Sequence, residues 1–324
     1  MLRCPRRVAR KPLYRNTGAE GASAALASIS LRFILGNAMS SNPTPPFAEQ
    51  NQSFPGLTSK MDPKPDHGEN SYEGSGQLKG KRALITGGDS GIGAAVAIAF
   101  AREGADVAIA YLPPEQEDAE EISALIEAAG VKTLLLPGDI SEAGRPQKII
   151  DELVSSFGGI DILVNNAAYQ AWLPNFEDIT MDEWRRHFDV NVHAAMELTL
   201  VAVPHMGSGG SVLFTSSVNS KHPMPTLIPY SATKATLANL TLGLSQALTG
   251  KGIRVNAVLP GPIWTPFIPA GMDAESVASF GSQSPMGRPG QPAELASAYV
   301  MLASDKASFT TGALVTVAGG MPIF

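Results

Sequence analysis

From Leu78 onward, short β-rich runs alternate with runs of helical spacing, and this alternation constrains the fold more than any other feature. The predicted strands lie within residues 81–88, 106–112, 132–140, 160–168, 209–217, 253–261 and 311–320. The predicted helices lie within residues 90–105, 113–130, 145–159, 180–206, 230–250 and 291–304. Strands joined by helices of this length predict right-handed crossovers and a parallel sheet covered on both faces. We therefore predict one α/β domain over residues 78–324.

Composition excludes several classes of protein. The chain of 324 residues is 44% hydrophobic with a formal net charge of −6, which argues against a nucleic-acid partner. Cys4 is the only cysteine, so an intrachain disulfide or a cysteine zinc cluster is impossible. The histidines lack the spacing of a metal site, and no apolar stretch approaches the roughly 20 residues that span a bilayer. We expect a soluble protein that needs no catalytic metal.

The N-terminal part differs in composition from the rest. Residues 1–38 are rich in arginine and poor in acids, which is typical of an organelle transit peptide. The alternative is that translation starts at Met39 or Met61, and a cytoplasmic location is then expected. Residues 39–77 are rich in proline, serine, glycine and asparagine, which predicts an extended polar arm. Within it, Phe54, Pro55 and Leu57 could lie across a neighbouring surface.

The segment TGGDSGIG, residues 86–93, lies between the first predicted strand and its helix. Gly87 can form the turn, Gly91 lets backbone N–H groups approach a pyrophosphate, and Gly93 lets helix and strand pack closely. A glycine triplet alone also suits an ordinary tight turn. Its position after the first strand of an alternating chain favours a dinucleotide at the helix N-terminus.

The segment YSATK places Tyr230 four residues before Lys234, so both side chains lie on one face of a predicted helix. An ammonium near a phenol favours the phenolate, and we expect it to lower the pKa of Tyr230. Such a phenol could exchange protons near neutral pH. The alternative is an amphipathic pair on the protein surface.

Several motifs together carry a family resemblance. TGGDSGIG, GDI, NNAA, VNV, TSS, YSATK and PGPIWTP follow one another as in the short-chain dehydrogenase/reductase family, from about Leu78 to the C-terminus. The chain further resembles its branch of bacterial oxidoreductases and plant homologues named glucose and ribitol dehydrogenases. The resemblance implies a Rossmann-type doubly wound parallel sheet of about seven strands in a single domain.

The resemblance also implies an NAD(P)-dependent oxidoreductase that interconverts a carbonyl and an alcohol by hydride transfer. Aldehydes, or polyols and sugars, are the expected small-molecule substrates. One alternative is a 3-oxoacyl-carrier-protein reductase-like enzyme, which would favour a basic patch near the pocket. Another is a dinucleotide-binding sensor without turnover.

Four residues match the catalytic positions of the family. Ser217 would hydrogen-bond the substrate carbonyl, Tyr230 would transfer the proton, Lys234 would lower its pKa, and Asn191 would hold a water that relays protons to the lysine. The residues expected to bind the cofactor are Gly87, Asp89, Ser90, Gly91, Ile92, Gly93, Tyr111, Asp139, Ile140, Asn165, Ala167, Ala168, Tyr230, Lys234, Pro260, Gly261, Ile263 and Thr265.

The sequence does not choose between NADP and NAD. The second predicted strand ends at Tyr111 and Leu112 without the acid that usually binds a ribose diol, and Glu115 comes only later. A basic residue that would favour a 2′-phosphate is also missing, since Ser90 precedes Gly91. We expect NADP to be accepted alongside NAD.

Two further expectations concern mobility and assembly. Residues 267–286 read as a mobile lid over the substrate. Related enzymes pair the long helices at 180–204 and 230–249 across two-fold axes, so the resemblance implies a homo-oligomer, a tetramer or a dimer.

Overall fold

The computed structural model describes residues 42–322, and the expected leader at 1–38 lies outside them. Seven parallel strands form one sheet in the order β3-β2-β1-β4-β5-β6-β7, as the doubly wound resemblance implies. The strands are β1 (Arg82–Thr86), β2 (Asp106–Tyr111), β3 (Thr133–Pro137), β4 (Ile162–Asn165), β5 (Ser211–Thr215), β6 (Arg254–Pro260) and β7 (Leu314–Val317).

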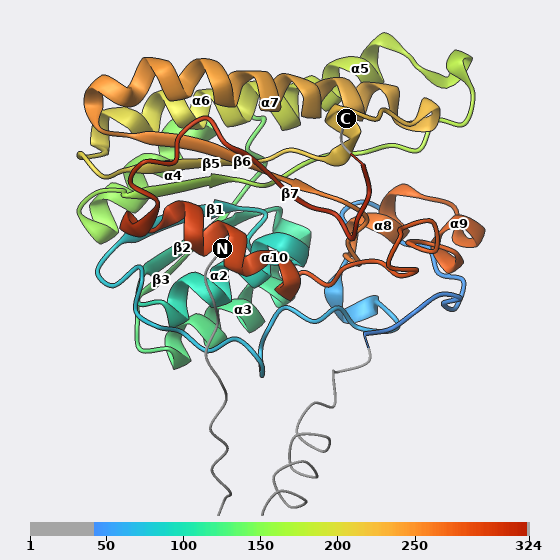
Figure 1. Ribbon diagram of the computed structural model, residues 1–324, viewed down its shortest axis with the longest axis horizontal. Helices are drawn as coiled ribbons and strands as arrows, with labels where there is room; N and C mark the ends of the chain where they lie inside the picture. Colours follow the sequence, from blue (N-terminus) through green and yellow to red (C-terminus); the bar gives the residue numbers. More distant parts are fainter. Residues whose placement is uncertain (1–41, 323–324) are drawn as a thin grey trace, which may run out of the picture. The chain divides into compact units, whose positions relative to one another are not determined.

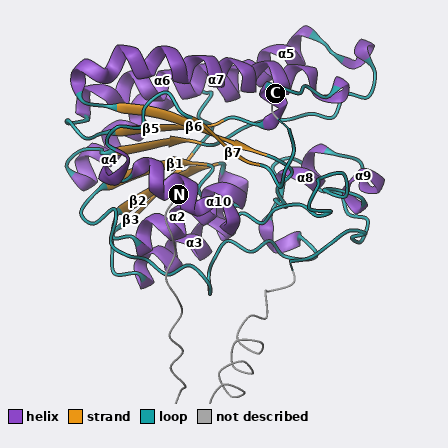
Figure 2. Cartoon of the chain, in the orientation of Figure 1, coloured by secondary structure: helices purple, strands orange, loops and turns teal. Residues whose placement is uncertain are grey.

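Helices cover both faces of this sheet (Figure 1). One face carries α2 (Gly91–Arg102), α3 (Gln116–Ala128) and α10 (Ala293–Ala303). The other face carries α4 (Arg145–Phe157), α6 (Ala194–Ala202) and α7 (Ile228–Leu248), and α5 (Met181–Phe188) continues the α6 layer. Figure 2 shows the strands enclosed between these two helical layers.

The central strands are buried on both faces, and this explains their nearly continuous apolar sequences. In β1, Leu84 belongs to the core beneath α4 and α6, while its neighbour Ile85 belongs to the core beneath α2 and α10. Ile85 pairs in register with Ile109 of β2 and Val164 of β4. The pairing aligns the carboxyl ends of these strands at one edge of the sheet.

The long helix predicted at 180–206 is interrupted. It begins at the N-cap Thr180, whose hydroxyl accepts a hydrogen bond from the N–H of Glu183 (3.1 Å). Between α5 and α6, residues Asp189–His193 form a π-helical turn centred on Asn191. Such turns often occur at functional sites, because the extra residue redirects side chains.

The region expected to be a mobile lid contains two short helices, α8 (Phe267–Gly271) and α9 (Ala274–Ala278), beside the carboxyl edge. The polar arm crosses them: Phe47 N–H donates to the carbonyl of Ala278, and Gln52 N–H donates to that of Pro269 (both 2.9 Å). Trp264 is fully buried, stacks on Phe47 and donates its indole N–H to the carbonyl of Pro63 (2.8 Å). The arm and the lid therefore share a small hydrophobic core.

No helix within residues 42–322 is long and apolar enough to cross a membrane.

Candidate active site

A cavity of about 780 Å³ lies at the carboxyl edge of the sheet. It reaches from the glycine turn after β1 to Tyr230 on α7, and the arm and α8 contribute to its walls. It also adjoins the position where neighbouring strands β1 and β4 send their connections in opposite directions. Open α/β sheets bind ligands at such a switch point.

The glycine turn leaves space and donors for an anion. Gly87 has a left-handed backbone (φ +62°), and its N–H donates to the carbonyl of Ala110 at 2.7 Å. Gly91 (φ +50°) opens α2, and a Cβ there would meet the Thr265 side chain at 2.9 Å. The N-cap Ser90 makes no side-chain hydrogen bond to the helix. The first N–H groups of α2 are thus available to a phosphate.

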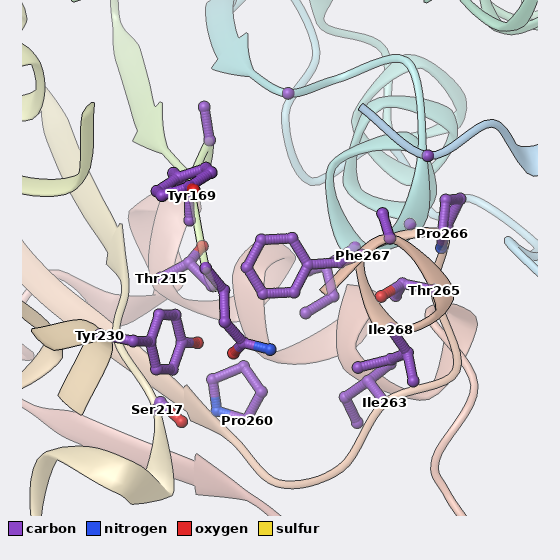
Figure 3. Close-up of a pocket in the computed structure, with 18 of the residues that line it drawn as sticks. Tyr169, Thr215, Ser217, Tyr230, Pro260, Ile263, Thr265, Pro266, Phe267 and Ile268 are labelled. Atoms are coloured by element: carbon purple, nitrogen blue, oxygen red, sulfur yellow. The ribbon is translucent and has the colours of Figure 1, made fainter. Parts of the chain in front are cut away.

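Ser217, Tyr230 and Lys234 meet at the opposite end of the cavity, and all three are buried. In Figure 3 the hydroxyl of Tyr230 points into the cavity near Ser217, with Phe267 on the facing side. Lys234 Nζ lies 5.4 Å from the centre of the Tyr230 ring and donates to the carbonyl of Thr215 (2.8 Å). The spacing read from YSATK therefore does bring a phenol and an ammonium together inside a pocket.

The electrostatics of this pair differ from the expectation. Burial raises the pKa of Tyr230 to about 12, although a hydrogen bond with Ser217 acts in the opposite direction. Burial also lowers the pKa of Lys234 to about 7. The expected lowering of the Tyr230 pKa by Lys234 is therefore wrong for this structure, because desolvation of the phenolate dominates.

Asn191 lies behind the reacting groups and does not line the cavity. Its amide donates to the carbonyl of Tyr169 (2.9 Å) and to Thr233 Oγ1 (3.0 Å), and its Oδ1 accepts from the N–H of Tyr169 (2.7 Å). These bonds connect the π-helical turn, the loop after β4, and α7. Asn191 is thus placed to hold Tyr169 at the pocket wall and to brace the helix that carries Tyr230.

Most residues expected to bind a cofactor do line the cavity, with two exceptions. Gly93 instead packs against the backbone of Gly87, so that a Cβ would collide there. Asn165 points to the other face of the sheet and donates to Thr199 Oγ1 (3.2 Å). The expected residues that line the cavity are Gly87, Asp89, Ser90, Gly91, Ile92, Tyr111, Asp139, Ile140, Ala167, Ala168, Tyr230, Lys234, Pro260, Gly261, Ile263 and Thr265.

The neighbouring Asn166 lines the cavity and was not predicted. Its amide donates to the carbonyls of Thr86 (3.1 Å) and Gly87 (3.2 Å), and its Oδ1 accepts from Thr215 Oγ1 (3.1 Å). It therefore joins β1, β4 and β5 at the floor of the site. The alternation of side chains along β4 was the signal that separates Asn165 from Asn166.

The substrate side of the cavity was predicted in part: Phe267 belongs to the expected lid and Phe54 to the expected arm, whereas Tyr169 and Gln170 were not predicted. Tyr169 and Gln170 follow β4, and Phe267 comes from α8. Phe54 of the arm packs edge-on against Tyr169, with ring centres 5.2 Å apart. The guanidinium of Arg186 lies 4.0 Å from the Tyr169 ring centre and 5.5 Å from that of Phe54. The arm thus forms a wall of the pocket itself.

The cavity fits a dinucleotide. Glycines stand where a side chain would intrude, and the start of α2 offers N–H donors. Within residues 42–322, no group of three His, Cys, Asp or Glu side chains could hold a metal ion.

Comparison with known proteins gives consistent matches. Residues 87–322 match the family model described as Enoyl-(Acyl carrier protein) reductase. A rice protein (Oryza sativa subsp. japonica) named glucose and ribitol dehydrogenase homolog is 43% identical over 298 residues, covering 87% of this chain and 99% of the rice protein. The Arabidopsis thaliana protein named NADPH-dependent aldehyde reductase 1, chloroplastic, is 41% identical over 280 residues, covering 84% of this chain and 96% of its own.

A solved structure of a short chain dehydrogenase from Burkholderia cenocepacia, in complex with NADP, superposes with a TM-score of 0.71 and 34% sequence identity. The match covers 75% of this chain and 98% of that chain.

Proposed function

The chain belongs to the short-chain dehydrogenase/reductase family of oxidoreductases, and from this premise we propose that it reduces aldehydes to alcohols with NADH or NADPH. Oxidation of polyols or sugars is the reverse reaction of the same site. The names of the rice and Arabidopsis relatives support these two substrate classes. The observation that carries the proposal is a buried Tyr230 hydroxyl beside Ser217, in the same cavity as an uncapped helix N-terminus.

The reduced cofactor, when bound, supplies a hydride to the carbonyl carbon. Ser217 holds the carbonyl oxygen by a hydrogen bond, and Tyr230 donates its proton to that oxygen. Ser217 is oriented by its own backbone neighbour, since its Oγ accepts from the N–H of Asn219 (3.1 Å). The two hydroxyls thereby fix the carbonyl in one orientation.

The high pKa of Tyr230 suits reduction. At neutral pH the phenol is protonated and ready to donate, because burial disfavours the phenolate. Loss of the proton leaves a phenolate, and we propose that the proton is returned through Lys234, whose Nζ lies 5.4 Å from the centre of the Tyr230 ring. We propose that Asn191 acts by holding the chain around this pair, and that a water beside it returns a proton to Lys234.

A substrate panel tests the proposal. Aldehydes, polyols and sugars are assayed with NADH, NADPH and their oxidised forms, and we expect aldehyde reduction to be the fastest reaction. Tyr230→Phe should strongly lower the turnover rate while cofactor binding persists. Absence of turnover on every member of the panel, or full activity of Tyr230→Phe, would contradict the proposal.

The pH dependence gives a second test. Reduction needs the protonated phenol, so its rate should not fall through loss of the Tyr230 proton below the pKa of about 12. Oxidation needs the phenolate, so its rate should rise with pH up to that value. An oxidation rate that is already constant at neutral pH would contradict this assignment.

An acyl-carrier substrate is the rival within the family. Arg185 and Arg186 line the cavity, but Asp182 and Asp189 line it too, and Arg185 pairs with Asp182 at 3.0 Å. The charges therefore balance, and a basic patch for an acidic carrier is not formed there. Comparing a free aldehyde with a 3-oxoacyl thioester in one assay separates the two substrates.

We also propose that residues 78–324 are the catalytic domain and that it assembles as a homo-oligomer through its long helices. Leu200 on α6 and Leu242 on α7 are exposed apolar residues, and they suit such an interface. Light scattering of the wild type and of a Leu242→Glu variant tests it. Residues 1–38 are proposed to be a leader or an untranslated segment of a cytoplasmic protein, and mass spectrometry of the native N-terminus decides between them.

A further inference from the structure

A row of buried polar side chains lies behind Tyr230 and Lys234, at the end of β5. Thr215 is the last residue of this strand and lines the cavity (Figure 3). Its hydroxyl lies 2.7 Å from the hydroxyl of Tyr299, a fully buried residue of α10, and 3.1 Å from Asn166 Oδ1. Tyr299, Thr215 and Asn166 therefore form a buried row that joins a helix to two strand ends.

The partners of Asn166 determine the direction of hydrogen bonding along this row. Its amide N–H groups donate to the carbonyls of Thr86 and Gly87, so its Oδ1 is the atom that faces Thr215. An amide oxygen can only accept, so the Thr215 hydroxyl must donate to it. The Tyr299 hydroxyl therefore donates to Thr215 Oγ1. Tyr299 is thus the first donor of a row that ends at the glycine turn.

The backbone of the same strand end holds Lys234. The Nζ of Lys234 donates to the carbonyl of Thr215 (2.8 Å), and this carbonyl is the one hydrogen-bond acceptor that Nζ reaches within residues 42–322. The next residue, Ser216, donates its hydroxyl to the backbone carbonyl of Lys234 (2.7 Å). A displacement of the strand end would therefore move the ammonium relative to the Tyr230 ring.

Packing alone does not explain the hydroxyl of Tyr299. The neighbouring core residues of α10, Leu295, Ala296 and Val300, are apolar, and a phenylalanine would fill almost the same volume as the tyrosine. A buried hydroxyl costs free energy unless it forms a hydrogen bond. Burial raises the pKa of Tyr299, although the hydrogen bond with Thr215 acts in the opposite direction. The phenol therefore stays protonated and remains a donor to Thr215.

Resting on the proposed function, we propose that Tyr299 is a positioning residue, which acts through the Thr215 hydroxyl to fix the strand end whose carbonyl holds Lys234. Tyr299 does not line the cavity, so it does not touch the substrate. The strand end needs such support because β5 pairs with β4 only as far as Phe214, whereas Thr215 still pairs with Val258 of β6. On the unpaired side, the buried row replaces the missing strand contacts.

Steady-state kinetics of aldehyde reduction test the inference. Tyr299→Phe should lower kcat about fivefold, which is the effect of one buried hydrogen bond. KM for the aldehyde and the dissociation constant of the reduced cofactor should stay within about twofold of the wild-type values. Ser211→Ala is the matched control and should leave kcat unchanged. Ser211 begins β5, and its buried hydroxyl donates to the carbonyl of Leu302 in the same helix α10 (3.2 Å).

Variants of Thr215 test the route by which Tyr299 acts. Thr215→Val removes the hydroxyl and should lower kcat by a similar factor, whereas Thr215→Ser retains the hydroxyl and should keep most of the rate. In the double variant Tyr299→Phe/Thr215→Val the two losses should not multiply, because both substitutions break the same row. Should Tyr299→Phe fail to fold, the contrast between Thr215→Val and Thr215→Ser still decides.

The outcomes separate this inference from the proposed function. A wild-type kcat in Tyr299→Phe, an equal loss in Ser211→Ala, or a loss confined to KM or to cofactor binding overturns the positioning role. Losses that multiply in the double variant, or equal rates of Thr215→Val and Thr215→Ser, overturn the route through the Thr215 hydroxyl. All these results leave the oxidoreductase proposal intact. A wild type that turns over no aldehyde, polyol or sugar overturns the proposed function and the inference with it.

Discussion

The two ends of the cavity are built in different ways. The cofactor end consists of short connections that directly follow β1, β2 and β3, and pairing of these strands in the sheet fixes their backbones. The substrate end combines the loop after β4 with α8 and with Phe54 from the arm, which is more than a hundred residues away from Tyr169 in the sequence. Its side chains are held by aromatic and cation–π contacts instead of strand pairing.

This difference implies a division of tasks. Groups fixed by the sheet edge can be positioned accurately enough for hydride and proton transfer. A wall assembled from an arm and short helices can change its side chains without disturbing the sheet. We therefore expect substitutions at the cofactor end to affect every substrate equally, and substitutions at the substrate end to affect substrates selectively.

The largest expected effect is at Tyr230, whose hydroxyl lies in the cavity beside Ser217. Tyr230→Phe should lower the rate of aldehyde reduction about 10²- to 10⁴-fold, because the general acid is removed. The dissociation constant of the reduced cofactor should stay close to the wild-type value. Tyr72→Phe removes a distant hydroxyl that donates to Glu103 (2.7 Å) and serves as the control. A comparable rate loss in that control would refute a specific role of Tyr230.

The second largest effect is expected from a substitution at the cofactor end of the cavity. Gly91→Ala should weaken cofactor binding roughly tenfold, since a positive φ costs an L-residue about 1–2 kcal/mol and the Cβ would meet Thr265. All substrates should lose catalytic efficiency by the same factor. Isothermal titration of the cofactor measures this, with Gly130→Ala as a strained but remote control. A loss of catalytic efficiency for only some substrates would contradict the proposed division of tasks between the two ends of the cavity.

A substrate-end substitution should have a smaller and selective effect. Phe54→Ala removes an edge-on aromatic contact worth about 1 kcal/mol, so KM for bulky aldehydes should rise roughly fivefold. KM for a small aldehyde and the cofactor dissociation constant should change little. Phe309→Ala, at a fully exposed site, provides the matched control. Equal changes for all aldehydes would show that the arm does not contribute to specificity.

The smallest expected effect is on stability. The folded-state pKa of Asp89 is raised above its unfolded value, so the stabilisation from this carboxyl is full at acidic pH and is lost as the pH rises through the raised pKa. Asp89→Asn should thus melt a few degrees above the wild type in alkaline buffer and show no such gain in acid. Thermal denaturation at several pH values measures the difference. A gain in melting temperature that is the same at every pH would contradict the raised pKa of the buried Asp89 carboxyl.

Much of the cofactor end was predictable because its determinants are local. The strand–turn–helix pattern around Gly87 and Gly91, and the four-residue spacing of Tyr230 and Lys234, are encoded within single elements. The prediction failed at Asn165 because a one-residue shift along a strand exchanges the faces of the sheet. The pKa of Tyr230 also could not be read from the spacing, since burial depends on all the elements packed around the phenol.

The sequence alone determined the alternating α/β order, the parallel sheet and the pairing of Tyr230 with Lys234, because hydrophobic periodicity and short-range geometry act over a few residues. Tertiary structure alone decided that Phe54 reaches Tyr169 and that Asn191 braces α7. It also decided that Asp89 is buried. These features depend on distances between segments that are remote in the chain, and only the packed fold sets such distances and the loss of water around each group.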